Sequence, residues 1–264
     1  MSVVMTVSLI FGFSALAMIL VWLLALKIRN IGIVDVAWAG LMAIAGIFCA
    51  AVAQGTDLAR ISVALFAGFW GLRLFLSLYV RVRHEPEDGR YQALRAAWNG
   101  SPGKLFVFFQ GQAIIVALFS LPFIAAANNT NVTLDFWFFT ATAVFVLSVT
   151  GESLADRQLA AFRNNPANRG KTCRSGLWAW SRHPNYFFEW LHWFAYLFLA
   201  IGSSHFWLSL VGPVLMLAFL YRVSGIPWTE AQALRSRGDD YRRYQSEVSA
   251  FFPLPPKSSD NGAL

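Results

Sequence analysis

The chain has 264 residues, of which 57% are hydrophobic and only 13% are charged. Soluble domains are about 45–50% apolar and about 25% charged, so the composition excludes an ordinary soluble domain and indicates a membrane-embedded protein. The formal net charge of +7 does not require nucleic acid as a partner, because membrane proteins gather basic residues in their cytoplasmic loops. We therefore expect the lipid bilayer, and not nucleic acid, to be the partner.

Runs of about 20 mostly apolar residues predict an all-α, polytopic membrane protein with about seven transmembrane helices. The spans are placed at 3–26, 31–53, 60–82, 104–127, 134–162, 183–202 and 204–224. The first run lacks a basic segment before it and is interpreted as a retained span, not a signal peptide. Basic residues follow the odd-numbered spans, which places the amino terminus outside and the carboxyl terminus in the cytoplasm.

The carboxyl-terminal part leaves the membrane pattern. The segment 226–250 is amphipathic and predicts a helix on the cytoplasmic surface. Several prolines follow it, and we expect residues 253–264 to form a disordered tail after a single transmembrane domain, 1–252. The cysteines, Cys49 and Cys173, lie far apart in different surroundings, so we expect neither a disulfide nor a metal site.

Two polar stripes lie on apolar helical patterns on either side of the stretch 163–182. In each stripe the members are 0, 4, 7 and 11 residues apart, which places them on one face of a helix. The members are Glu152, Asp156, Leu159 and Arg163 in the first pattern and Asn185, Glu189, His192 and Tyr196 in the second. Such stripes indicate either a polar seam in a helix bundle or a binding site.

The stretch between the stripes is strongly basic. Its cations are Arg163, Arg169, Lys171, Arg174 and Arg182. They lead into a predicted helix start near Pro184, where free backbone N–H groups and the helix dipole favour an anion. Topology alone would also gather cations here, but Asn185 and Glu189 just inside the helix favour a bound dinucleotide. No GxGxxG motif between a strand and a helix is present in the sequence, which argues against a Rossmann domain.

Ionisable residues within the predicted spans are further candidates, because they are costly in a bilayer. Asp35 is either an interfacial cap or a pocket residue. Arg73 needs a carboxylate or an anionic ligand; a structural ion pair with Asp35 or Glu152 is the alternative. His183, just before the predicted helix, is a cap or loop residue.

Several segments together resemble a known family. They read NIGIVDVAWAG, GLRL, EDGRYQALR, ADRQLAAFRNNPANRGKTCRSGLWAWSRHPNYFFEW and YRRYQSEVSAFFP in chain order. The chain resembles the bacterial membrane proteins grouped with steroid 5-alpha-reductases, over nearly its whole length and most specifically between Asp156 and Trp190. The resemblance implies a bacterial inner-membrane enzyme that uses NADPH to reduce a C=C bond conjugated to a carbonyl in a lipophilic substrate, with the cofactor in the region 134–252.

The resemblance also implies roles for particular residues. Arg163 and Lys171 look like ligands of the cofactor phosphates, and Asn185 and Glu189 look like contacts of its nicotinamide end. The full set of cofactor candidates is Arg73, Asp156, Arg163, Arg169, Lys171, Arg182, His183, Asn185, Glu189 and Tyr241. The catalytic candidates are Asp35, Tyr186 and Glu189. Asp35 is the predicted acid at the carbonyl oxygen, since the proton-donating glutamate and tyrosine of the steroid enzymes have no clear counterpart.

Two other classes of function stay open. The element Arg182-His183-Pro184-Asn185-Tyr186-Phe187-Phe188-Glu189 is also similar to isoprenylcysteine and phospholipid methyltransferases, which use S-adenosylmethionine. That cofactor carries no phosphate, so the density of cations in 163–182 favours the reductase. A non-catalytic lipid-binding or scaffold protein would need no convergent polar stripes.

Overall fold

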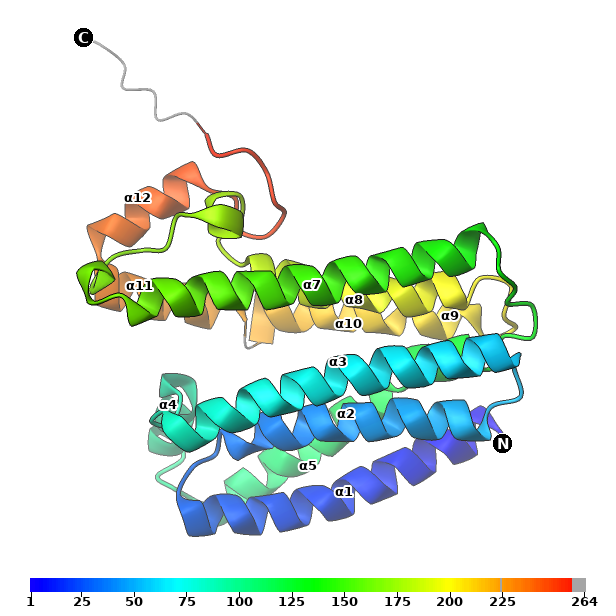
Figure 1. Ribbon diagram of the computed structural model, residues 1–264. Coiled ribbons are helices and arrows are strands. Elements are labelled where there is room, and N and C mark those ends of the chain that lie inside the picture. Colours follow the sequence, from blue (N-terminus) through cyan, green and yellow to red (C-terminus); the bar gives the residue numbers. More distant parts are fainter. Residues whose placement is uncertain (224, 258–264) are drawn as a thin grey trace. The chain divides into compact units, whose positions relative to one another are not determined.

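The computed structural model describes residues 1–223 and 225–257, and every regular element among them is helical (Figure 1). The elements in chain order are α1 Val3–Ile28, α2 Ile33–Val52, α3 Asp57–His84, α4 Gly89–Ala97, α5 Pro102–Phe119, α6 Leu121–Ala127, α7 Phe136–Asn164, the 3-10 turns η1 Pro166–Asn168 and η2 Gly176–Ala179, α8 Pro184–Leu199, α9 Phe206–Ser209, α10 Val211–Ala218, the π-helical turn η3 Phe219–Val223, α11 Ile226–Arg237 and α12 Asp239–Glu247. The all-α class predicted from the apolar runs is confirmed for the described residues.

Six stretches in the described residues are long and apolar enough to cross a bilayer. They are Val3–Ile28, Ile33–Val52, Asp57–His84, Pro102–Ala127, Phe136–Asn164 and Phe206–Arg237. The chain therefore has the helices of an integral membrane protein. The remaining predicted span, 183–202, corresponds to α8, whose 16 residues rise about 24 Å, less than the bilayer core of about 30 Å.

The fold divides into two compact units. Unit 1 comprises Met1–Ala141 and Tyr196–Gly212, and unit 2 comprises Thr142–Ala195 and the described residues from Pro213 onward. The helices α7 and α8 each contribute to both units. The predicted domain 1–252 thus contains two packing units, and each is described by itself.

In unit 1, helices α2 and α3 approach each other closely through small residues. A Cβ added to Gly71 would lie 2.8 Å from the Ala43 Cβ, and one added to Gly46 would overlap the Cβ of Ala67. Small residues allow helix backbones to approach within a bilayer, where apolar side chains gain little from leaving lipid. This close packing builds the frame of unit 1.

The short helix α4 is fastened to the beginning of α2. Arg90 and Tyr91 on α4 donate to the two carboxylate oxygens of Asp35, each at 2.6 Å. Glu87 just before α4 accepts from the Ile31 backbone N–H at 2.5 Å. Burial raises the pKa of Tyr91, as does the charge of Asp35, so the phenol keeps its proton and acts as a donor. The sequence did not predict α4 as a separate helix.

We expect Asp35→Ala to destabilise unit 1 by about 2 kcal/mol, because Arg90 and Tyr91 both lose the charged acceptor of a hydrogen bond. Thermal unfolding in detergent measures the loss. Asp57→Ala is the control: the Asp57 side chain is 88% exposed in its pair with Arg60, so we expect a change within about 0.5 kcal/mol. Equal stability of both variants would show that the Asp35 contacts do not hold α4.

The amphipathic segment 226–250 forms two helices, so the prediction of one helix is wrong. Gly238 separates α11 from α12 with a φ of 52°, a conformation that glycine adopts without the steric penalty of a side chain. The predicted tail begins with residues that make backbone hydrogen bonds: Leu254 N–H donates to Trp180 O at 3.0 Å and Lys257 N–H to Glu247 O at 2.9 Å. The rest of that predicted tail, 258–264, lies outside the described residues.

Candidate functional site

The two predicted polar stripes meet in unit 2. Asp156 on α7 accepts a hydrogen bond from the Asn185 side-chain amide on the first turn of α8, at 3.2 Å. Helix α8 begins at Pro184, as predicted, because proline fits the first turn of a helix, where its missing N–H is not needed. Glu189 follows Asn185 by one turn on the same helix face. The structure therefore brings two candidate cofactor residues from separate helices into contact.

Close approach of α7 and α8 makes this contact possible. Gly151 lies on α7, five residues before Asp156, and a Cβ added there would lie 2.6 Å from the Phe188 Cζ. The Phe188 ring therefore packs directly on the α7 backbone. His192, the third member of the α8 stripe, is buried beside Phe145 of α7.

The basic stretch separates into two groups. Arg174 and Arg182 are committed to carboxylates of the same unit: Arg174 contacts Glu247 at 2.7 Å, and Arg182 contacts Glu230 at 2.7 Å. The other group consists of the exposed cations Arg163, Arg169 and Lys171. Among the described residues these three have no carboxylate within ion-pair distance.

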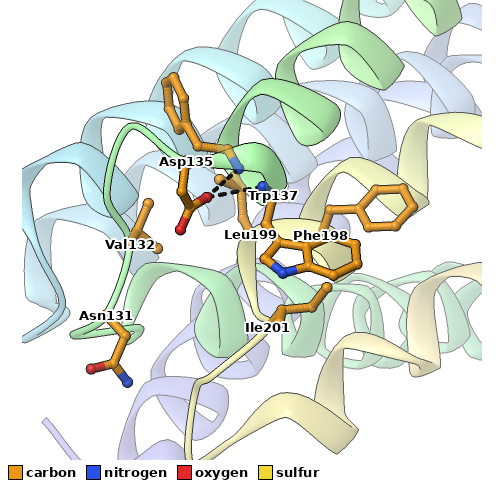
Figure 2. A pocket seen from close by; sticks show the side chains of 8 residues that line it. Asn131, Val132, Asp135, Trp137, Phe198, Leu199 and Ile201 are labelled. Carbon is orange, nitrogen blue, oxygen red and sulfur yellow. Dashed lines mark hydrogen bonds between the residues drawn. The ribbon is translucent and has the colours of Figure 1, made fainter.

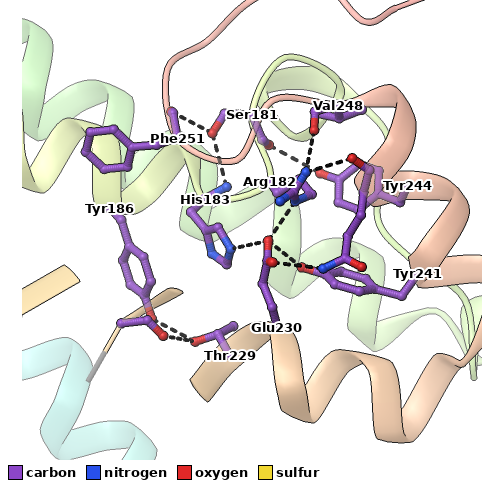
Figure 3. A network of polar contacts seen from close by, with 12 residues as sticks. Ser181, Arg182, His183, Tyr186, Thr229, Glu230, Tyr241, Tyr244, Val248 and Phe251 are labelled. Carbon is purple, nitrogen blue, oxygen red and sulfur yellow. Dashed lines mark hydrogen bonds and ion pairs between the residues drawn. The ribbon is translucent and has the colours of Figure 1, made fainter. Parts of the chain in front are cut away.

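Glu230 on α11 is the centre of a polar network (Figure 3). Its Oε1 accepts from the Arg182 Nε at 2.7 Å and contacts the His183 Nε2 at 3.2 Å. Its Oε2 accepts from the Gln245 side chain of α12 at 2.8 Å, and the Tyr241 hydroxyl donates to Oε1 at 3.5 Å. One carboxylate thus joins the loop before α8, helix α11 and helix α12.

His183 is buried within this network. Burial lowers the pKa of His183, and the contact with Glu230 opposes that shift only in part. The ring is therefore neutral at neutral pH. Because an ionised carboxylate only accepts hydrogen bonds, the proton lies on Nε2. The ring stacks on Tyr186 at a centroid distance of 5.3 Å, and the Tyr186 hydroxyl lies 3.2 Å from the Thr229 Oγ1 (Figure 3).

Tyr241 and Tyr244 form the α12 side of this arrangement. Burial raises the pKa of both phenols, so both keep their protons. The Tyr244 hydroxyl donates to the Trp178 carbonyl at 2.5 Å, and the Arg237 guanidinium lies over the Tyr241 ring at 5.1 Å. Tyr241, a candidate cofactor residue, is 3% exposed.

The candidates Asp35 and Arg73 belong to unit 1, in α2 and α3. Both carboxylate oxygens of Asp35 are engaged, one by the Arg90 guanidinium and the other by the Tyr91 hydroxyl. Its role as the acid stays a prediction. Sequence reasoning missed Glu230, Thr229 and Gln245, since nothing in the 226–250 pattern showed that they face the loop before α8.

A small pocket in unit 1 is lined by none of the candidate site residues (Figure 2). Its lining residues are Asn131, Val132, Asp135, Trp137, Phe138, Phe198, Leu199 and Ile201. Asp135 caps the start of α7 by accepting from the Trp137 N–H at 2.9 Å and the Phe138 N–H at 3.0 Å. The Phe138 N–H lowers the pKa of this carboxyl, so Asp135 has no proton to donate at neutral pH.

The residues of unit 2 suit a phosphorylated cofactor in charge and in donor type. The exposed guanidinium and ammonium groups of Arg163, Arg169 and Lys171 can bind phosphate oxygens, and arginine does so in a bidentate fork. The Asn185 amide has a donor and an acceptor in one group, which suits a carboxamide.

Comparison with family models assigns the chain to a protein family. Residues 21–248 match the family described as "Protein of unknown function (DUF1295)". The match spans most of the chain, and the chain belongs to this family. Searches of curated proteins and of solved structures gave no match.

Proposed function

We propose that the chain is a membrane-embedded, NADPH-dependent reductase of a C=C bond conjugated to a carbonyl in a lipophilic substrate. The family to which it belongs is related to steroid 5-alpha-reductase-like proteins, which supports this class of activity. One observation of the structure carries the proposal furthest: the Asn185 side-chain amide donates to the Asp156 carboxylate at 3.2 Å. The stretch that joins their two helices in sequence has exposed cations without a carboxylate partner among the described residues.

The charge of the stretch 163–182 favours NADPH over S-adenosylmethionine. NADPH carries a pyrophosphate and a 2′-phosphate, whereas S-adenosylmethionine carries no phosphate. Arg163, Arg169 and Lys171 supply three cations that the protein does not neutralise with its own described carboxylates. Exposed cations without a carboxylate partner are available to bind an anion, which supports the phosphorylated cofactor.

The roles proposed for the chain follow from the donor and acceptor types. Asn185 and Glu189 orient the nicotinamide end, with Asp156 fixing the Asn185 amide. The bound cofactor supplies a hydride to the β-carbon of the substrate. A donor at the carbonyl oxygen stabilises the negative charge that develops there, and such a donor acts most strongly where water is excluded. Tyr186 and Glu189 are the candidates of unit 2 for that donor.

The proposed setting is a bacterial inner membrane, with the amino terminus outside and the carboxyl terminus in the cytoplasm. In this topology α8 completes a seventh span, and its 16 residues require a locally thin bilayer or the polar residues at its ends to lie near the headgroups. The substrate, for which a sterol, a fatty enoyl chain and an isoprenoid enone are open, enters from the bilayer.

Binding of NADPH to the purified protein tests the proposal. We expect NADPH to quench tryptophan fluorescence at saturable concentrations, and Arg163→Ala to weaken this binding by about tenfold, since one charged hydrogen bond contributes about 1.5–3 kcal/mol. Arg242→Ala removes an exposed arginine of α12 that is paired with Asp239, and it should leave the affinity within about twofold.

S-adenosylmethionine is titrated in parallel. Binding of S-adenosylmethionine without binding of NADPH would overturn the reductase in favour of a methyltransferase. Binding of neither cofactor would favour a non-catalytic membrane protein.

A further inference from the structure

Glu230, at the centre of the polar network, is not among the residues proposed to bind the cofactor. It nevertheless fixes the position of residues that are. Glu230 is 16% exposed in its side chain and accepts hydrogen bonds from Arg182, Gln245 and Tyr241, besides the His183 contact. Its donors come from two segments far apart in the chain, the loop before α8 and helix α12. A carboxylate so surrounded holds several parts of the protein in one arrangement.

Arg182 transmits this arrangement to the backbone. Its Nη1 donates to the carbonyl oxygens of Gln245 and Val248, at 2.9 and 2.6 Å, where α12 ends. The Arg182 backbone N–H donates to Ser249 O at 2.8 Å. Both the side chain and the main chain of Arg182 are therefore fixed, immediately before α8 begins.

The beginning of α8 follows directly from these contacts. The His183 carbonyl accepts from the Phe187 N–H at 3.1 Å, so His183 starts the hydrogen-bond ladder of the helix. The next side chains, Asn185 and Tyr186, contact Asp156 and Thr229. Thr229 is the neighbour of Glu230 on α11. A change at Glu230 would thus alter both the position of the first turn and its rotation.

We infer that Glu230 is a positioning residue for the cofactor site: through Arg182 and His183 it fixes the first turn of α8, so that Asn185 stays aligned with Asp156. This inference rests on the proposed function for the identity of the cofactor, but the alignment itself is independent of any ligand. Glu230 touches neither Asn185 nor Asp156, and it acts through the residues between them.

Glu230→Gln tests the inference, because it keeps the size of the side chain and removes the charge that Arg182 requires. We expect amide hydrogen exchange in peptides covering 183–189 to become about tenfold faster, as the first turn of α8 opens more often. NADPH affinity should fall by about tenfold, and Glu230→Asp should restore part of both. Asp239→Asn removes one carboxylate from the start of α12, with a 93% exposed side chain, and should change neither quantity.

The outcomes separate the inference from the proposed function. Unchanged exchange in 183–189 in the Glu230→Gln protein would overturn the inference whether or not NADPH binds. Faster exchange with equal NADPH affinity would overturn it too, since the helix start would then not position the site. Absence of NADPH binding to the wild-type protein counts against the proposed function alone, and exchange still decides the alignment.

A merely stabilising role predicts a different pattern. Glu230→Gln would then lower the unfolding temperature, while exchange in the folded protein would rise evenly over unit 2 and not first at α8. That even rise would overturn the inference.

The double variant Asn185→Ala, Glu230→Gln gives a complementary measurement. We expect the two losses of NADPH affinity to be non-additive, because both changes disturb one contact. Additive losses would overturn the inference.

Discussion

Replacing Gly151 with alanine should separate α7 from α8 and abolish most cofactor binding in the proposed reductase. The added Cβ would lie 2.6 Å from the Phe188 Cζ, and Phe188 is only 8% exposed, so the ring has little free space into which to move. Adding one carbon to a well-packed core costs about 1–3 kcal/mol. Relief of the overlap moves the helices apart and lengthens the 3.2 Å contact between Asp156 and Asn185.

Two measurements check this expectation. The unfolding temperature of Gly151→Ala in detergent should fall, and its NADPH affinity should fall by more than about tenfold. The matched control is Gly111→Ala on α5, where nothing lies within 4 Å of the added Cβ. Alanine is favoured over glycine inside a helix by about 1 kcal/mol, so this variant should be as stable as the wild type or more so.

A second variant tests whether the overlap with Phe188 causes the effects of Gly151→Ala. Phe188→Leu in the Gly151→Ala background removes the ring that the new Cβ meets, and it should restore part of both stability and affinity. Lack of any restoration, or an undisturbed Gly151→Ala protein, would show that the close approach of α7 and α8 does not set the site.

The sequence predicts most of the helices because apolar runs and the residues that begin helices are local signals. Pro184 marks the start of α8, which the structure confirms. The 0, 4, 7, 11 spacing places Asp156 and Asn185 on polar stripes of their helices, and the structure brings these two side chains into contact. The span at 183–202 was predicted too long, because apolar residues continue beyond Leu199 into the loop where the helix has ended.

Helical periodicity does not predict which side chains meet from segments far apart in the sequence. Asp35 meets Arg90 and Tyr91, which follow it by 55 and 56 residues, and no pattern within α2 indicates this contact. Glu230 likewise lies 48 residues after Arg182. The basic stretch 163–182 divides into paired and exposed cations only once the acidic side chains of α11 and α12 are placed.

The carboxyl-terminal segment illustrates the same limit, since its prolines suggested a chain without structure. Within the predicted tail, Leu254 N–H instead donates to Trp180 O at 3.0 Å. Just before it, the Ser181 hydroxyl donates to Phe251 O at 2.8 Å, so the chain runs along the loop before α8. Phe251 is 1% exposed and packs edge-on against Phe187, Trp190 and Tyr221. Its burial holds the segment against the first turns of α8.

We therefore expect Phe251→Ala to lower the free energy of unfolding of the protein by about 3–5 kcal/mol, the range for removing a buried aromatic ring from a core. Phe252→Ala is the matched control, because this adjacent ring faces Phe187 and Trp190 but is 48% exposed. It should cost about 1 kcal/mol. Thermal and denaturant unfolding of both proteins measures the difference. Equal losses would show that the carboxyl-terminal segment is held by its backbone hydrogen bonds alone, and that Phe251 does not anchor it to α8.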